Sequence, residues 1–523
     1  MNIKIRLVWF SLLTFCVLAT LAPEKVSAQK PQAETFAKGE LLVKFTDSST
    51  TRSGRTANRA VGATVLETLG DLGWQRVKLP KNLSIDSAID LYRHQPGVEY
   101  AQPNYYYHLL NTTPNDPLLT DPGMYGLSMI SAPSAWDLTT GSSSVVVADI
   151  DTGLRYTHQD IAANVWTNPD EIAGNGLDDD GNGFVDDVHG YDFRFNDSDP
   201  MDEHGHGTHT AGTIGAVGNN LLGVVGVNWT VKIMAIKIYS ASGTDTTSAM
   251  LINAYNYVRM MKLRGVNIRV TNNSYGGCNE ACGYDQATKD ALDAMGDAGI
   301  LNVFAAGNDG INNDLTPSYP VSYTSPSILG VAASTSTDGK ASFSSYGPIS
   351  VDLAAPGVSV LSTTFSSDSS YGTLSGTSMA TPHVAGAAAL LAAYNPNLSA
   401  ASLKATLMNT VDVLGVWNGL IKTGGRLNVD RALRNQTVCT FAPATNLLSV
   451  PTKGGIFTVN IAAGQNCDYS VKSGSQWVHV LSPTPMSGNG SVVFRVSVNP
   501  TITRETTVRV GDQTFTVRQS RSQ

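Results

Sequence analysis

One serine of the chain is placed where it could act as a nucleophile. Ser378 follows a polar, glycine-containing turn at residues 375–377 and precedes a run of Ala, Val and Leu with helical character. This predicts a hydroxyl at the start of a mostly buried helix, where backbone N–H groups without intrahelical partners can stabilise an anion. Such a serine is a nucleophile if a base can reach it. Taken alone, it could equally be the N-cap of a core helix.

A base and a carboxylate that could serve this serine lie earlier in the chain. Three histidines fall in HGHGTH at residues 204–209, at the start of a second small-residue segment that is expected to be helical. An imidazole can remove the serine proton during attack, and a carboxylate such as Asp151 can orient that imidazole. The histidines could instead bind zinc, but HGHGTH lacks the glutamate of an HExxH helix and no third ligand is evident. Asp151 could be a turn aspartate, because a glycine follows it closely.

The elements that must position these groups are a strand and two helices. The apolar run 145–148 shortly precedes Asp151, and such a run is typical of a strand buried on both faces of a parallel sheet. Functional residues of such sheets gather at the carboxyl ends of the strands, which is where Asp151 lies. The pattern therefore predicts an α/β domain with a parallel sheet.

Three segments together resemble a known family. ADIDTG, HGHGTHTAG and GTSMATPHVAG are similar to the three signature segments of the subtilisin-like serine proteases (subtilases), in the family's order of Asp, His and Ser. The resemblance covers about residues 115–433 and implies a three-layer fold with a mostly parallel sheet. It also implies that Ser378 is the nucleophile, His206 the general base and Asp151 its orienting partner. The other two histidines of HGHGTH do not match the family position.

The same resemblance extends to substrate binding. FAAGND at residues 304–309 resembles the family's AAGN segment, which makes Asn308 the side-chain donor of an oxyanion hole beside the backbone N–H of Ser378. NSYGG at 273–277 resembles the segment that pairs with an extended protein or peptide substrate as an added strand. An uncharged pocket floor favours apolar or uncharged residues before the cleaved bond. The expected substrate-binding residues are Ser274, Tyr275, Gly276, Ala306, Gly307 and Ser318, and Gly276 and residues 305–307 are expected to flank the pocket for the residue before the cleaved bond.

Two structural calcium sites are expected. The acidic loop 178–187 carries oxygens at alternating positions with glycines at the turns, which is typical of a calcium loop. It is not a full EF-hand, since His189 occupies the position of the bidentate glutamate, and a solvated acidic loop is the alternative. The expected ligands there are Asp178, Asp180, Asn182, the Phe184 carbonyl, and Asp186 or Asp187. By resemblance, Asp116, Asp160 and Asn220 hold a second ion with carbonyls of residues 218–224; hard oxygen ligands exclude zinc or copper as natural occupants.

The first 28 residues are expected to be a signal peptide. Lys4 and Arg6 precede an apolar run at 7–21, and small residues at 26–28 offer a cleavage site. A membrane anchor is the weaker alternative because the run is short for a spanning helix. A lipoprotein reading of Cys16 fails because a bulky phenylalanine precedes it. We therefore expect a secreted, bacterial protein.

Residues 29–110 are expected to form a small α/β propeptide. Segments 41–45 and 74–79 are candidate strands, and 84–95 fits an amphipathic helix. The closing segment PGVEYAQPN resembles the end of the inhibitory propeptide of subtilisin-like proteases. The resemblance implies a zymogen that is inhibited by its own propeptide and cut between Tyr105 and Thr113.

The C-terminal region differs in its sequence pattern from the expected catalytic domain, residues 111–433. From 437 to 523 short alternating strands at 455–459, 492–496 and 506–510 predict a β-sandwich. CTF, NCDYSV, SQWVHV and FTVRQS resemble the BACON family of β-sandwich modules, for which carbohydrate or mucin binding is suspected. Trp477 could bind a sugar or belong to the core. A spacer or adhesion role is expected.

Cysteines and charge set the remaining expectations. In an oxidising compartment, Cys278 is expected to pair with Cys282 and Cys439 with Cys467, with separate thiols as the alternative. The 523 residues carry a net charge of −8, and the part after residue 110 is more acidic than the chain as a whole because residues 1–110 are net positive, which argues against a nucleic-acid partner. We expect a monomer. Two alternative functions are considered. One is a pseudoprotease or adhesin, and the other is a polysaccharide-active protein, for which no paired carboxylate motif is found.

Overall fold

The computed structural model describes residues 36–46, 52–106, 112–276, 284–499 and 502–520. The chain divides into two units between Leu110 and Asn111. The expected signal peptide and the expected pair Cys278–Cys282 lie outside the described residues. Among the helices in the described part, none is both long and apolar enough to cross a bilayer.

The first unit is a four-stranded antiparallel sheet, in the order β2-β3-β1-β4, packed against two helices. The expected strands and helix are confirmed, and Ser84 caps α2 by accepting a hydrogen bond from the backbone N–H of Ser87 at 3.2 Å. The segment PGVEYAQPN forms most of β4, which pairs with β1. Its elements are β1 (Phe36–Phe45), α1 (Arg52–Val61), β2 (Thr64–Leu69), β3 (Trp74–Lys78), α2 (Ile85–Arg93) and β4 (Val98–Tyr105).

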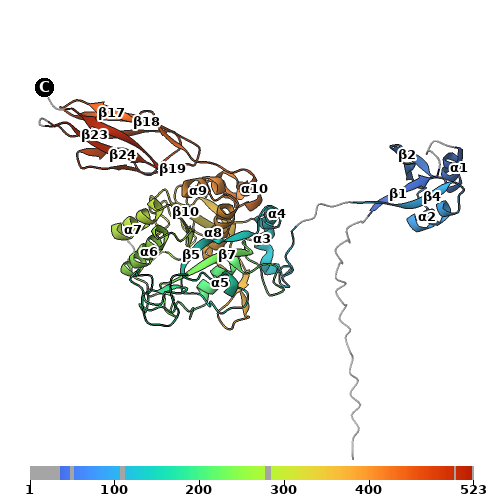
Figure 1. Cartoon of the computed structure of the whole chain (residues 1–523), viewed down its shortest axis with the longest axis horizontal. Helices are drawn as coiled ribbons and strands as arrows, with labels where there is room; N and C mark the ends of the chain where they lie inside the picture. The colour runs from blue at the N-terminus through green and yellow to red at the C-terminus, as the bar shows by residue number, and fades with distance from the viewer. Residues whose placement is uncertain (1–35, 47–51, 107–111, 277–283, 500–501, 521–523) are drawn as a thin grey trace, which may run out of the picture. The chain divides into compact units, whose positions relative to one another are not determined.

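The second unit is built on a nine-stranded sheet in the order β14-β15-β11-β10-β9-β8-β5-β7-β6 (Figure 1). Every neighbouring pair is parallel except β14 with β15, so the mostly parallel sheet is confirmed. The strands are β5 (Gly141–Asp151), β6 (Gly190–Asp192), β7 (Thr230–Lys237), β8 (Ile268–Asn273), β9 (Leu301–Ala305), β10 (Ile328–Ser334), β11 (Leu353–Pro356), β14 (Asp412–Val413) and β15 (Gly425–Arg426).

Helices cover both faces of this sheet, which gives three layers. One face packs against α3 (Tyr125–Met129), α4 (Ala132–Trp136), α5 (His206–Gly215), α8 (Thr377–Tyr394), α9 (Ala400–Asn409) and α10 (Val429–Arg434), and the other against α6 (Ser248–Leu263) and α7 (Gln286–Asp297). A hairpin of β12 (Val360–Thr363) and β13 (Tyr371–Leu374) lies beside α5. Side chains alternate along β5, so Val147 faces α8 while Ile150 faces the opposite core. By the same alternation, Asp149 and Asp151 lie on the face of α5 and α8.

The C-terminal region is a β-sandwich, as expected. Its two four-stranded sheets have the orders β16-β18-β23-β21 and β17-β25-β24-β20, and a short pair β19-β22 accompanies them. Trp477 is partly buried against the core of the sandwich, with the Arg504 guanidinium 4.3 Å from its ring centroid. The strands are β16 (Phe441–Pro443), β17 (Leu447–Val450), β18 (Gly455–Ala463), β19 (Asp468–Tyr469), β20 (Val471–Ser473), β21 (Val478–Val480), β22 (Met486–Ser487), β23 (Gly490–Val496), β24 (Arg504–Val510) and β25 (Gln513–Gln519).

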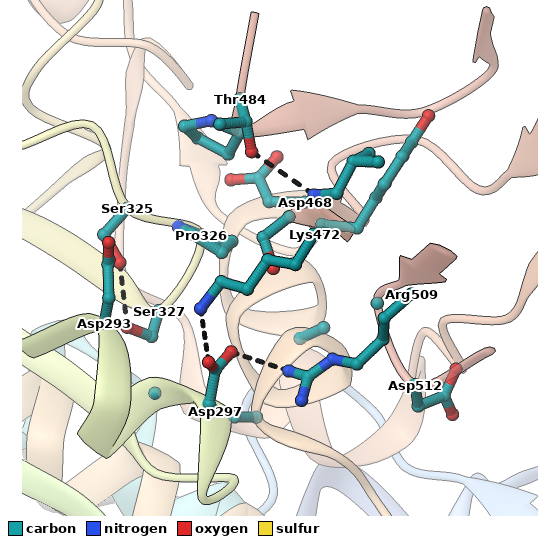
Figure 2. A pocket seen from close by; sticks show the side chains of 18 of the residues that line it. Asp293, Asp297, Ser325, Pro326, Ser327, Asp468, Lys472, Thr484, Arg509 and Asp512 are labelled. Carbon is teal, nitrogen blue, oxygen red and sulfur yellow. Dashed lines mark hydrogen bonds and ion pairs between the residues drawn. The ribbon is translucent and has the colours of Figure 1, made fainter. Parts of the chain in front are cut away.

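The sandwich is joined to the α/β layers by charged contacts around a cavity of about 360 Å³ (Figure 2). Asp297, the last residue of α7, points at two cations of the sandwich. One carboxylate oxygen pairs with Lys472, and the other pairs with Arg509 at 2.6 Å. All three side chains are between 30% and 46% exposed, so these pairs lie at the solvated edge of the junction.

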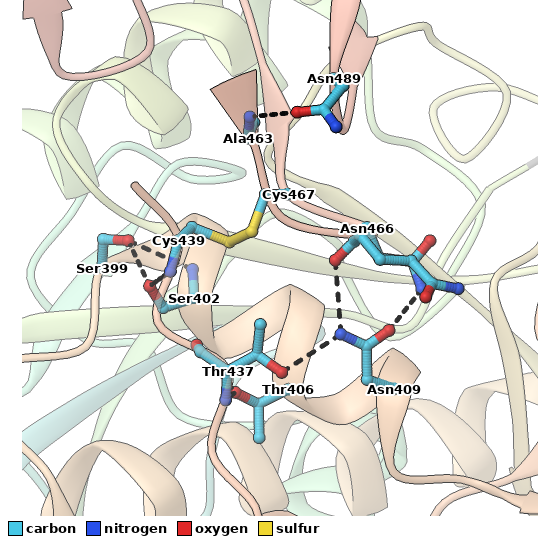
Figure 3. Close-up of a disulfide and its surroundings, with 11 residues drawn as sticks. Ser399, Ser402, Thr406, Asn409, Thr437, Cys439, Ala463, Asn466, Cys467 and Asn489 are labelled. Carbon is cyan, nitrogen blue, oxygen red and sulfur yellow. Dashed lines mark hydrogen bonds between the residues drawn. A yellow bond between two sulfur atoms is a disulfide. The ribbon is translucent and has the colours of Figure 1, made fainter. Parts of the chain in front are cut away.

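Helix α9 lies at the centre of the junction and packs into two hydrophobic cores. Leu403 and Leu407 pack into the α/β core, whereas Ala405 packs into the core of the sandwich. Beside it the structure joins Cys439 to Cys467 in a disulfide, with the Cα atoms 5.5 Å apart (Figure 3). The backbone N–H of Cys439 donates to the α9 serine Ser402 at 2.9 Å.

Candidate active site

The carboxyl end of β5 and the N-terminus of α5 bring an aspartate and a histidine together. Asp151 is the last residue of β5 and His206 is the first residue of α5. Their side chains join through a contact of 2.7 Å between His206 Nδ1 and Asp151 Oδ1. Asp151 is almost fully buried, at 2% exposed, while the His206 ring is 23% exposed. The imidazole is thus held at Nδ1 by a buried carboxylate, while part of the ring stays accessible to solvent.

The electrostatics of this pair favour a proton on the ring. Burial lowers the pKa of His206, but the charge and the hydrogen bond of Asp151 outweigh burial and raise this pKa above its ordinary value. His209 differs because it is buried and holds the carbonyl of Val360 at 3.0 Å through Nε2. Burial lowers the pKa of His209 to about 4, so this ring stays neutral. His206 is therefore the histidine suited to accept a proton.

Ser378 lies on the same cleft, at the second position of α8. It lines a hollow of about 310 Å³ together with Asp151 and His206. Its hydroxyl donates to the carbonyl of Ser274 at 2.9 Å, and the Ser274 hydroxyl donates back to the Ser378 carbonyl at 3.0 Å. Activation of Ser378 requires its hydroxyl to turn from that carbonyl toward Nε2 of His206, a rearrangement common when substrate binds.

Asn308 faces the same hollow with its amide oriented by the start of α8. Its Oδ1 accepts from the backbone N–H of Thr377 at 2.8 Å and from the Thr377 hydroxyl at 3.0 Å. These bonds hold Oδ1 and leave the Nδ2 hydrogens available to the cleft. The preceding Gly307 has φ +104°, a conformation that L side chains rarely adopt, so the turn that presents Asn308 needs glycine. Asn308 and the helix start can together donate N–H groups to an anion.

Most of the expected substrate-binding residues line the cleft. Ser274, Tyr275, Gly276, Gly307 and Ser318 do so, as does Ala305 of the expected segment 305–307, whereas Ala306 does not. The Ala306 side chain is fully buried in a separate cluster beneath the sheet edge, because it follows the last residue of β9 and points to the opposite side. The other lining residues were not predicted as site residues, although four of them lie within recognised segments: Thr152, His204, Asp309 and Thr377. Tyr239 and Gly243 lie outside those segments.

The acidic loop gathers a group of carboxylates that could hold a cation. Glu171, Asp178 and Asp180 place one oxygen each within 4.8 Å of one another. Glu171 Oε2 is buried without a hydrogen-bond partner, while Asp180 Oδ1 has the Arg264 guanidinium at 3.3 Å. Glu171 was not predicted because it lies seven residues before the loop motif and is brought to it by folding.

Of the other expected ligands of this loop, Asn182 contacts the trio directly and Asp187 contacts it through Asn182. The Asn182 amide donates to Asp180 at 3.1 Å and to Asp187 at 2.9 Å. Asp187 is fully buried and also accepts from the Tyr257 hydroxyl, and burial raises its pKa to about 6. Phe184 packs its ring 4.9 Å from that of Tyr257. Asp186 accepts from the backbone N–H groups of residues 175 and 176.

The second expected calcium site also forms a cluster. Asp116 and Asp160 are both buried, and Asn220 lies between them. The Asn220 amide donates to Asp160 at 2.8 Å, and its backbone N–H donates to Asp116 at 3.3 Å. Burial raises the pKa of both carboxyls. Two buried acids that share one loop form a set of hard oxygen donors.

Comparison with known proteins gives two family matches. Residues 142–437, more than half of the chain, match the profile described as the Subtilase family. Residues 22–104 match the Fervidolysin N-terminal prodomain.

Individual proteins show the same likeness. Thermitase from Thermoactinomyces vulgaris is 36% identical over 322 residues, which cover 62% of this chain and 99% of thermitase. An extracellular protease of Xanthomonas campestris pv. campestris is 32% identical over 429 residues, or 73% of this chain and 70% of the relative. A solved protease structure from Pseudoalteromonas arctica matches with a TM-score of 0.50 and 29% identity, covering 62% of this chain and 99% of the other.

Proposed function

The chain belongs to the subtilase family of serine proteases, and we propose that it is a secreted endopeptidase made as an autoprocessed zymogen. The observation that carries this proposal is the contact of 2.7 Å between His206 and Asp151, in the hollow that Ser378 also lines. The three side chains come from different elements, so their convergence follows from the fold and not from nearness in sequence.

In the proposed reaction Ser378 Oγ attacks the carbonyl carbon of a peptide bond. His206 Nε2 takes the serine proton as the new C–O bond forms, and Asp151 stabilises the imidazolium through Nδ1. His206 then gives the proton to the amine as the C–N bond breaks, which leaves an acyl-enzyme on Ser378. Water, activated by the same imidazole, releases the carboxylic acid and restores the serine.

The negative oxygen of the tetrahedral intermediate is expected to lie between Asn308 Nδ2 and the backbone N–H of Ser378. Both donors are already oriented, because Asn308 Oδ1 is held by Thr377 and the Ser378 N–H is at the N-terminus of α8. Donors fixed before the reaction need no reorganisation when charge develops.

The test of this function is hydrolysis of an unfolded protein by the purified chain, together with labelling by a fluorophosphonate. We expect new peptides from the substrate and the label on the fragment that contains Ser378. Neither turnover nor label would favour the rival reading, in which the chain is a pseudoprotease or adhesin that uses the fold for binding.

The oxyanion donor can be tested separately with Asn308→Ala. Loss of this donor is expected to lower kcat by about 10²–10³, the cost already measured for the corresponding donor in subtilisin, with KM changed little. Asn312→Ala is the matched control, because this asparagine of the same loop bonds a backbone N–H outside the cleft. A drop in kcat below fivefold, or one equal in both variants, would contradict the role of Asn308.

Substrates are proposed to bind as extended protein segments that pair with the backbone of Ser274–Gly276, which directly follows β8. Main-chain pairing of this kind gives affinity with little sequence preference. Ser318 presents a hydroxyl to the cleft, which supports a preference for apolar or uncharged residues before the cleaved bond. The first unit is proposed to be the propeptide, which inhibits the enzyme until the chain is cut between Tyr105 and Thr113.

The C-terminal sandwich is proposed to be a spacer or adhesion module. Glycan binding has little support from Trp477, whose ring packs on the sandwich core under Arg504. The two sandwich cations that line the junction cavity, Lys472 and Arg509, are both paired with Asp297 (Figure 2). The chain is proposed to act as a monomer without a nucleic-acid partner.

Calcium is proposed to stabilise the fold without taking part in the reaction. The donor set fits this ion, because Glu171, Asp178 and Asp180 are hard oxygen ligands and Glu171 Oε2 is buried without a partner. A divalent cation there would hold together the long loop between β5 and β6. Asp116, Asp160 and Asn220 are proposed to hold a second ion.

Removal of calcium is expected to lower the melting temperature. At a calcium concentration about 100 times Kd the bound ion contributes about 2.7 kcal/mol, which corresponds to roughly 3 °C for a folded unit the size of residues 111–523. Glu171→Gln is expected to abolish a large part of this gain, measured by thermal unfolding with and without calcium in a Ser378→Ala background that prevents autolysis. Asp170→Asn is the matched control in the same segment. An equal calcium response in Glu171→Gln and Asp170→Asn would remove Glu171 from the ligand set.

A further inference from the structure

A second carboxyl group lies beneath the triad and takes no part in the reaction derived above. Asp149 precedes Asp151 by two residues on β5 and therefore lies on the same face of the strand. It is 3% exposed and does not line the cleft, so it cannot touch a substrate. A buried carboxyl beside a catalytic carboxylate is costly unless it is bonded or neutral.

The hydrogen bonds of Asp149 connect the elements that carry all three members of the triad. On one side, Asp149 Oδ1 accepts from the Asn272 amide of β8 at 2.8 Å. The same amide donates its second hydrogen to the Ser274 hydroxyl at 3.1 Å, and that hydroxyl donates to the carbonyl of Ser378. Two residues, Asn272 and Ser274, thus connect Asp149 to Ser378 through an unbroken chain of hydrogen bonds.

The other oxygen of Asp149 meets the helix that carries the base. Thr210 lies one turn after His206 on α5, and its hydroxyl is 2.9 Å from Asp149 Oδ2 and 3.0 Å from the carbonyl of Gly207. A hydroxyl has one hydrogen, and a carbonyl can only accept. If Asp149 is ionised, the two acceptors share the one hydrogen of Thr210; if Asp149 is protonated, Thr210 donates to Gly207 and accepts from Asp149, so each contact has its own hydrogen. The geometry therefore fits a carboxylic acid better than a carboxylate.

The surroundings agree with a neutral acid. Burial, and then repulsion by Asp151, raise the pKa of Asp149 well above its ordinary value, against the opposing effect of its hydrogen bonds and of His206. The ionisable groups that act on it are Asp151 on its own strand and His206 on α5. At the contacts described, β8 presents the Asn272 amide and α5 the Thr210 hydroxyl.

We propose that Asp149 is a positioning residue that, as a neutral carboxylic acid, ties β5, α5 and the Ser274–Ser378 contact into one rigid unit. This inference rests on the proposed peptidase function. In this role Asp149 aligns nucleophile and base without adding a second negative charge beside His206. An asparagine can make the same bonds, since its carbonyl accepts from Asn272 and its amide donates to Thr210, whereas a valine can make neither.

The test compares Asp149→Asn, Asp149→Val and the control Ile150→Val, a buried residue of the same strand that faces the opposite core. Loss of two buried hydrogen bonds is expected to lower kcat of Asp149→Val by about five- to twentyfold, with KM within about twofold. Asp149→Asn is expected to restore at least about half of wild-type kcat. Full activity of Asp149→Val, or activity of Asp149→Asn as low as that of Asp149→Val, would overturn the positioning role.

The pH profile tests whether Asp149 is neutral, which the comparison of kcat values does not decide. If Asp149 is neutral, Asp149→Asn removes no charge, and the acidic limb of kcat/KM stays at the wild-type pH. If Asp149 is ionised, its loss lowers the pKa of His206 and moves that limb down by about one pH unit or more, which would overturn the neutral acid. The His206 titration by NMR in a Ser378→Ala background measures the same shift without turnover, so it judges Asp149 even if the wild type shows no hydrolysis and the proposed function fails.

Discussion

Replacement of Ser378 by alanine is expected to leave the first unit, the proposed propeptide, attached to the rest of the chain. Without the hydroxyl no acyl-enzyme can form, and kcat is expected to fall by about 10⁶, the size measured for the corresponding serine in subtilisin. Wild type is expected to begin between residues 106 and 114, whereas Ser378→Ala begins before residue 36. Intact mass and N-terminal sequencing of protein made in a cell-free, protease-free system distinguish the two states.

Ser375→Ala is the matched control for this experiment. Ser375 lies three residues before the nucleophile, is exposed, and accepts a hydrogen bond from the backbone N–H of Ser359 outside the cleft. It is expected to process like wild type. Identical processing of wild type and Ser378→Ala, without labelling of wild type by a phosphonate, would exclude Ser378 as the group that cuts the chain.

The sequence was sufficient for the parts of the site that depend on local pattern. The apolar run before Asp151 predicts a doubly buried strand, and β5 ends at that residue. Small residues after His206 and Ser378 predict helices that begin at the site, and α5 and α8 begin there. These predictions hold because residue type, strand alternation and helix start are all properties of short segments.

Contacts between distant segments were not predictable in the same way. Glu171 joins the acidic loop only through folding, and nothing in its own surroundings marks it as a ligand. Of the two neighbouring alanines that were expected at the pocket, only Ala305 lines the cleft, because the exact end of β9 decides which side chain faces it. The sequence shows Asp149 as a charged residue near the end of an apolar run. Its hydrogen-bond partners could not be predicted, because they come from β8 and α5.

The packing at the junction with the sandwich was also not predictable from the sequence. The sequence pattern separates a catalytic domain from a C-terminal module, yet Ala405 of α9 belongs to the core of the module. A helix that is apolar on two sides looks like an ordinary buried helix, and only the structure shows that its sides face different cores. The module is therefore packed on the α/β layers and is not merely tethered to them.

A buried ion pair at this junction is expected to be decisive for stability. Lys404 of α9 and Asp468 of the sandwich are 2.8 Å apart and only 5% and 7% exposed. Burial lowers the pKa of Lys404, but Asp352 and Asp468 outweigh burial and raise it. For Asp468, burial raises the pKa, but Lys404 and Lys422 outweigh burial and hold it below its ordinary value. Both groups are therefore charged in the folded protein.

Lys404→Met is expected to lower the free energy of unfolding by about 3–5 kcal/mol, because it leaves Asp468 buried with only the more distant Lys422. Differential scanning calorimetry in the Ser378→Ala background measures this loss. Lys472→Met is the matched control, since its pair with Asp297 is 30–46% exposed and is expected to contribute less than about 1 kcal/mol. Equal losses in the two variants would show that the junction does not depend on its buried charges.

The pH dependence of this pair follows from the direction of the two pKa shifts. Asp468 has a lowered pKa, so its contribution is complete above the ordinary aspartate value of about 4 and is lost as the pH falls below it. Lys404 has a raised pKa, so its contribution is complete below about 10.4 and is lost as the pH rises further. The difference in unfolding free energy between wild type and Lys404→Met is therefore expected to be largest near neutral pH and to shrink in acid, where Asp468 becomes protonated in both proteins. In Lys404→Met/Asp468→Leu, where both charges are replaced by apolar groups, much of the lost stability is expected to return, because the cost lies in the unpaired charge and not in the missing attraction.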